Sequence, residues 1–102
     1  MDASQKIESS GSTPEAQAAW DPATKKQFDQ MIAKIPVFLR SIAEKKVGQR
    51  AEKIVKDSNR TVVEEKDMID AFFAETPFGF HGPMKCDMED LRIDYVKYGH
   101  AK

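Results

Sequence analysis

The chain has 102 residues, enough for one domain with a modest hydrophobic core. Hydrophobic residues form 40% and charged residues 32%, as in ordinary soluble proteins, and the net charge of -1 argues against the strong positive field of most nucleic-acid-binding proteins. One cysteine excludes an internal disulfide framework, and we expect a cytoplasmic protein without membrane contact, because no secretory signal and no bilayer-spanning apolar run are visible.

The first 19 residues are rich in Ser, Ala and Gln. Such a segment buries too little apolar surface to offset the entropy lost on ordering, so residues 1–19 are predicted to be a disordered leader. Residues 20–102 are predicted to form a single helical domain, with a core at 20–74 and a C-terminal extension at 75–102.

The first predicted helix begins at Asp21 and Pro22, because an aspartate accepts hydrogen bonds from free helix-start amides and proline suits the first helical position. A stripe of apolar residues follows at helical spacing, namely Phe28, Met31, Ile32 and Ile35. Pro36 disfavours a helical conformation at the residue before it, so this helix is predicted to end at Ile35.

A long second helix is predicted from Val37 to Ser58. Its apolar positions recur at intervals of three and four: Leu39, Ile42, Ala43, Val47, Ala51, Ile54 and Val55. Thr61 with Glu64 resembles a capping box, which places a third helix at 63–74, or a short extended stretch followed by that helix. The core therefore has short–long–short helices, an order compatible with a histone-like arrangement.

The segment Pro77–Pro83 holds two Pro and two Gly, which predicts an irregular loop. Its Phe78 and Phe80 are expected to fold back onto the core. A fourth helix of about two turns is predicted around Met84, Met88 and Leu91. Residues 93–102 are expected to form a tail that docks through Tyr95, Val96 and Tyr98. No internal repeat is apparent.

The pattern that includes I-P-V-F-L-R resembles the small helical domain at the C-terminus of light-independent protochlorophyllide reductase, which also occurs as short stand-alone bacterial proteins. The residues that carry the resemblance are Trp20, Ile35, Pro36, Phe38, Arg40, Glu52 and Thr61. The reductase's cluster ligands lie in other parts of that enzyme, so the resemblance implies a non-catalytic accessory domain without a cofactor. It also implies a structural contact of Arg40 with Glu52 or with a helix-end carbonyl.

The basic second helix supports a different interpretation, a histone-like DNA-binding protein. The candidate phosphate contacts are Lys45, Lys46, Arg50, Lys53 and Arg60. Against this interpretation, Glu44, Glu52 and Asp57 lie on the same helix and are spaced for i,i+4 ion pairs such as Glu52 with Lys56. A run of alternating charges more often forms a solvated helix face.

His81, Cys86 and His100 are the candidates for metal binding, and His81 with Cys86 for nucleophilic catalysis. A structural zinc site normally needs four ligands, and no fourth ligand is specified by spacing. A nucleophile needs a base and a third orienting group, which the sequence does not identify. We therefore expect neither a metal site nor independent catalysis.

The remaining candidates are aromatic residues, Trp20, Phe38, Phe72, Phe73, Phe78 and Phe80, most of which are expected in the core. Any that stay exposed would form a docking patch. The leading hypothesis is a non-enzymatic accessory or protein-interaction module that binds a protein partner or a second copy. The alternatives are DNA binding and an accessory subunit that covers a tetrapyrrole or redox site.

Overall fold

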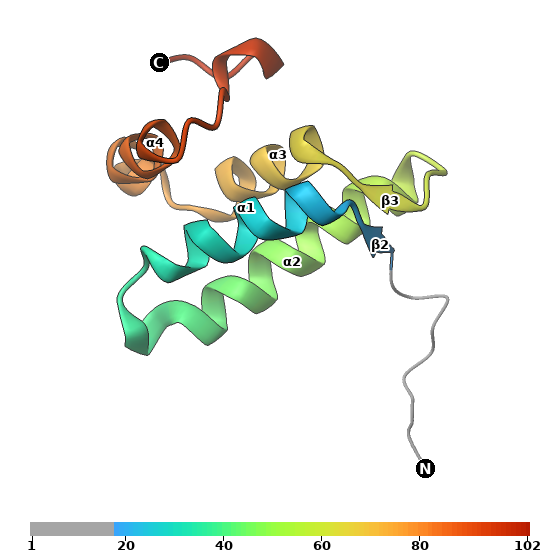
Figure 1. Cartoon of the computed structure of the whole chain (residues 1–102), viewed down its shortest axis with the longest axis horizontal. Coiled ribbons are helices and arrows are strands. Elements are labelled where there is room, and N and C mark those ends of the chain that lie inside the picture. The colour runs from blue at the N-terminus through green and yellow to red at the C-terminus, as the bar shows by residue number, and fades with distance from the viewer. Residues whose placement is uncertain (1–17) are drawn as a thin grey trace.

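A computed structural model describes residues 18–102, and within them the fold is all-α, as predicted (Figure 1). Its helices are α1 (Pro22–Ala33), α2 (Arg40–Asp57), α3 (Glu65–Glu75) and α4 (His81–Asp90). The short–long–short order of the first three helices and the short fourth helix are confirmed. The predicted leader lies outside the described residues, except for Ala18 and Ala19.

The start of α1 follows the predicted mechanism. The Asp21 carboxylate accepts a hydrogen bond from the Thr24 amide at 3.0 Å and one from the Thr24 hydroxyl at 3.2 Å, and Pro22 occupies the first turn. The helix ends at Ala33, two residues before the predicted end. The chain changes direction in the short turn between Ala33 and Pro36.

The second helix differs from the prediction at its start. Residues Val37–Leu39 form a 3-10 turn, η2, and α2 begins only at Arg40. The cause is Pro36, whose φ of -51° and ψ of 139° are not helical; its carbonyl accepts an i+3 bond from the Leu39 amide at 2.9 Å. Ile42, predicted to widen the apolar stripe that faces the core, is 55% exposed.

Asn59, with φ of 58°, ends α2 in a Schellman motif, in which the Arg60 amide donates to the Val55 carbonyl at 2.9 Å. The chain then forms β3 (Val62–Val63), which pairs in parallel with β2 (Ala19–Trp20). The extended stretch before the third helix, one of the two predicted alternatives, is thus present.

The predicted capping box is displaced by three residues. Glu64 caps α3, and its partner is Asp67, so the pair Thr61 and Glu64 does not form the box. Thr61 instead belongs to the strand region, where its carbonyl accepts a bond from the Ala19 amide at 3.0 Å.

The predicted irregular loop at Pro77–Pro83 is also wrong. Phe78–Phe80 form a second 3-10 turn, η3, and α4 begins directly afterwards at His81. Pro83 is the third residue of α4, in the first turn, where a residue without an N–H leaves no helical hydrogen bond unmade.

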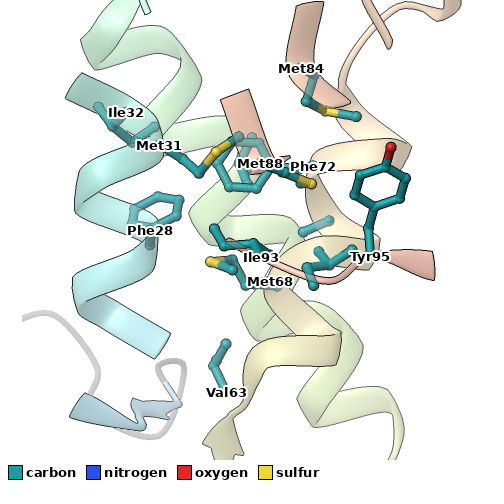
Figure 2. Packing of buried hydrophobic residues seen from close by; sticks show 14 of the residues in the cluster. Phe28, Met31, Ile32, Val63, Met68, Phe72, Met84, Met88, Ile93 and Tyr95 are labelled. Carbon is teal, nitrogen blue, oxygen red and sulfur yellow. The ribbon is translucent and has the colours of Figure 1, made fainter. Parts of the chain in front are cut away.

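The hydrophobic core joins all four helices (Figure 2). Phe28 and Met31 of α1 face Phe72 of α3 and Met88 of α4, and each of these four side chains is at most 2% exposed. The closest helix packing is between α2 and α3. Gly48 of α2 lies opposite Phe28, whose ring would be 3.8 Å from an added Cβ, so the glycine is not required for close approach.

The C-terminal tail is attached to the outer side of α3. Tyr98 donates a hydrogen bond to Glu65 at 2.6 Å, and His100 Nε2 lies 2.7 Å from the Asp70 carboxylate. The His100 ring stacks on Phe73 with centroids 4.0 Å apart. The tail is therefore docked through Tyr95 and Tyr98, as predicted, whereas Val96 is 48% exposed.

Asp67 joins α2 to α3. Its buried carboxylate accepts two bonds from the Arg60 guanidinium, at 2.6 and 3.0 Å, and one from the Glu64 amide at 2.9 Å. Burial alone would raise the pKa of Asp67, but the hydrogen bonds from Arg60 and from the Glu64 amide outweigh it and hold the pKa below its usual value.

We predict that Asp67→Asn lowers the free energy of unfolding by about 2–3 kcal/mol at neutral pH, because the guanidinium and the helix start lose their charged acceptor. A carboxyl group whose pKa is depressed in the folded state stabilises above its unfolded pKa, and this contribution is lost as pH falls through the folded value. The difference between wild type and variant should therefore shrink below about pH 4. Urea unfolding at several pH values, followed by circular dichroism, measures both effects.

Asp57→Asn is the matched control, because Asp57 forms an exposed i,i+4 pair with Lys53. Its cost should stay within about 0.5 kcal/mol at every pH. Equal costs for the two variants would contradict the role assigned to Asp67.

Candidate interaction surface

The largest exposed apolar side chains are concentrated at η2 and η3, the two 3-10 turns that follow Pro36 and Pro77 and that we call the Pro turns. Val37 and Phe38 of η2 are 74% and 80% exposed, and Phe78 and Phe80 of η3 are 88% and 64% exposed. With Ile42 on the first turn of α2, these five residues form a surface that we call the Pro-turn end. The expectation that most aromatic residues are in the core is wrong for Phe38, Phe78 and Phe80.

The first Pro turn is fixed by Arg40. Its guanidinium donates to the Ala33 carbonyl at 2.7 Å and to the Ile35 carbonyl at 2.8 Å, so it caps the C-terminal end of α1. Of the two predicted partners of Arg40, the helix-end carbonyls are the ones found. Glu52 instead accepts a bond from the Trp20 indole at 3.0 Å.

The second Pro turn has the same geometry. Pro77 has φ of -56° and ψ of 143°, and its carbonyl accepts an i+3 bond from the Phe80 amide at 2.8 Å. His81 takes the place of Arg40, because it is also the first residue of the following helix and its Nε2 lies 2.9 Å from the Thr76 carbonyl. Thus a polar side chain ties each turn to the carbonyl preceding its proline.

The equivalence extends over both halves of the chain and corrects the view that there is no internal repeat. Each half consists of a two-residue strand, a helix, a Pro turn, a second helix and a Schellman motif closed by a left-handed residue, Asn59 or Arg92. Trp20 pairs with Val63 in the sheet, and both immediately precede a helix cap. The second unit has a shorter final helix.

Figure 1 shows both Pro turns at the same end of the long axis, where α1 and α3 end. The ends of α1 and α4 are also joined by an ion pair between Lys34 and Asp90 at 3.6 Å. The two equivalent turns that carry the exposed apolar residues therefore lie toward one end of the molecule.

The five predicted phosphate contacts fall into two groups. Arg50, Lys53 and Arg60 are paired with carboxylates of the protein, on Glu75, Asp57 and Asp67 respectively. Lys45 and Lys46 are exposed, and no ion pair of theirs occurs within the described part of the chain. Of the five predicted phosphate contacts, the two without an ion pair are thus Lys45 and Lys46, one helical turn beyond Ile42.

The structure does not bring His81, Cys86 and His100 together into a metal-binding or catalytic site. The rings of His81 and His100 both pack against Phe73, with centroids 5.2 and 4.0 Å from it, whereas Cys86 is exposed on α4. Across residues 18–102 no group of three or more His, Cys, Asp or Glu side chains is placed to hold a metal ion.

Neither of two hollows on the described part of the surface is lined by a residue of the Pro turns. One of about 250 Å³ lies between the end of α4 and the tail, and one of about 330 Å³ lies along the C-terminal half of α2. Their lining residues are Glu89, Arg92, Ile93, Asp94, Tyr95, Val96 and Lys102 in the first, and Gln49, Glu52, Lys53, Lys56 and Asp57 in the second. In the first, a hydrogen bond to Glu89 together with desolvation raises the pKa of Tyr95 to about 12.

No described helix combines the length and apolar character needed to cross a bilayer. Comparison with known proteins gives one family match: the model described as Protein of unknown function (DUF2621) matches residues 12–101. No match was found among curated proteins or among solved structures.

This match corrects the resemblance drawn from the I-P-V-F-L-R turn. No family related to protochlorophyllide reductase is found, so the assignment to that type of domain is wrong. The residues that carried it have local structural roles in this fold: Pro36 and Arg40 make the turn, and Trp20 with Glu52 joins β2 to α2. The hypothesis of an accessory subunit that covers a tetrapyrrole depended on this resemblance, and it is therefore no longer supported.

The exposure of the turn residues predicts that they contribute little to folding. Phe38→Ser and Phe78→Ser should each change the free energy of unfolding by no more than about 0.5 kcal/mol. Phe28→Ala, which leaves a cavity in the core, should cost about 3–5 kcal/mol. Chemical denaturation of the three variants tests this contrast, and a cost above 2 kcal/mol for either serine variant would show that the turns are part of the core.

Arg40 is predicted to act on stability through its two carbonyl acceptors. Arg40→Ala should cost about 2 kcal/mol, since hydrogen bonds from a charged donor to the end of α1 are lost. Lys45→Ala, on the next turn of the same helix, should cost less than about 0.5 kcal/mol. Thermal unfolding of both variants makes the comparison, and equal midpoints would contradict the capping role.

Proposed function

The chain belongs to the family described as Protein of unknown function (DUF2621), and we propose that it is a non-enzymatic interaction module that docks through the Pro-turn end. The observation that carries the proposal is the exposure of Val37, Phe38 and Phe78, each at least 74% exposed. Apolar side chains gathered at one end of a small domain are typical of a binding surface.

The way in which the turns are held supports this proposal. Both are fixed by a proline and by a side chain that binds the preceding helix end, so the exposed residues lie on a rigid backbone. A preorganised surface loses little entropy when it binds, which favours affinity. The turns are thus built as contact elements, and their rigidity does not depend on their apolar side chains being buried.

The DNA-binding alternative draws less support from the same surface. Three of the five basic residues proposed for it already pair with carboxylates of the protein, which reduces the positive field available to phosphates. A cytoplasmic location remains part of the proposal and rests on the single cysteine.

Site-specific photocross-linking in the native host tests the proposal. With p-benzoylphenylalanine at position 38 or 78, we expect discrete adducts, because these positions would contact the partner directly. The same group at position 56, exposed at the far end of α2, should give none of these adducts. An identical pattern at all three positions, or no adduct with protein or lipid at any, would refute docking through the Pro-turn end.

A further inference from the structure

We propose that the Pro-turn end binds the surface of an anionic lipid bilayer, into which the tips of η2 and η3 insert. This inference rests on the proposed function, because it names what the docking end contacts. The earlier expectation of no membrane contact considered only spanning segments, whereas surface binding needs an apolar tip and nearby basic groups.

The shape of the surface is the first argument. The exposed apolar residues of η2 and η3 lie on two 3-10 turns, and none of them lines either of the two hollows described above. A bound peptide or protein segment normally occupies a groove. A fluid lipid interface accepts separate protruding side chains at any spacing, and Phe is well suited to it.

Charge is the second argument. Residues 34–46 contain four basic side chains, Lys34, Arg40, Lys45 and Lys46, and one acidic side chain, Glu44. Their net charge is +3, whereas the other described residues, 18–33 and 47–102, carry a net charge of -2. An anionic surface therefore attracts the η2 side of the molecule, which orients the η2 tip toward the lipid.

The acidic residues of α4 lie beyond its first turn, but one of them, Asp90, lies 3.6 Å from Lys34 and offsets part of the positive charge on the η2 side. Lys85 is in the first half of this helix, and Asp87, Glu89 and Asp90 are in its second half. Two of these acids have partners within the protein, since Glu89 accepts from Tyr95 at 2.5 Å and Asp90 pairs with Lys34. The η3 tip is thus followed first by His81 and Lys85.

The same charges disfavour a second copy as the occupant. A two-fold dimer places the same patch of both subunits face to face. Arg40, Lys45 and Lys46 of one copy would then meet the same cations of the other, which costs free energy.

The internal repeat adds a quantitative expectation. Two equivalent rigid tips at one end of the molecule can insert together, so their contributions to partitioning should multiply. From the apolar area of one phenylalanine, the loss of either Phe38 or Phe78 should weaken partitioning about tenfold, and the loss of both about a hundredfold.

Vesicle flotation of the full chain tests the inference. We expect binding to vesicles of phosphatidylcholine with phosphatidylglycerol, weaker binding at high salt, and little binding to phosphatidylcholine alone. Phe38→Ser, Phe78→Ser and the double variant should show the stated losses. These substitutions are at exposed sites, and a circular dichroism spectrum of each variant confirms that it is folded.

The charge contribution is tested with a matched pair. Lys45→Glu combined with Lys46→Glu should abolish the preference for anionic vesicles, whereas Lys56→Glu, at the opposite end of α2, should leave the binding within about twofold of wild type. Absence of flotation, or binding that neither the serine variants nor the double glutamate variant reduces, would overturn the inference.

The remaining outcomes separate this inference from the proposed function. A position-specific protein adduct at residue 38 without vesicle binding keeps the docking module and overturns its lipid partner. A dimer in light scattering that Phe38→Ser dissociates, again without vesicle binding, does the same in favour of a second copy. Absence of both vesicle binding and position-specific adducts overturns both proposals.

Discussion

The fold depends on a buried carboxylate at the junction between its two most closely packed helices. Asp67 closes the start of α3 and at the same time holds Arg60, which lies just beyond the end of α2. With Val55 and Val63 fully buried beside this junction, the angle between α2 and α3 has little freedom. The parallel pairing of β2 with β3 then fixes where α1 begins, and the core between the helices follows from these constraints.

Much of this architecture could be predicted because its signals are local. Asp21 with Pro22 starts α1, and Pro36 separates it from α2, since each of these effects acts within a few residues. The periodicity of the apolar residues identified the four helices and most of the core. Their exact ends could not be predicted in the same way: the choice of Glu64 over Thr61 as the cap of α3 depends on the pairing of Thr61 with Ala19, more than 40 residues away in sequence.

The interaction surface was harder to predict. Phe38 lies in the 3-10 turn before α2, and Ile42 lies on the first turn of α2, next to the apolar stripe that it was predicted to widen. Both side chains are exposed. The second turn was taken for an irregular loop because its two glycines and two prolines are typical of one. The similarity of the two turns cannot be recognised from sequence identity, since I-P-V-F-L-R and T-P-F-G-F-H share only the proline. A different sequence signal could have identified it. In both turns the proline is followed, four residues later, by a polar side chain that can reach back to the preceding helix end.

Within each turn, different residues maintain the backbone and form the exposed tip, and this separation has an evolutionary consequence. The proline and the first residue of the following helix maintain the backbone, while the residues between them contact little of the protein. Substitutions at the tips can therefore accumulate without loss of the folded state, and the two tips can diverge independently of each other. Descendants of one scaffold could in this way acquire new targets through changes at a handful of codons, with the helices and their core left as they are.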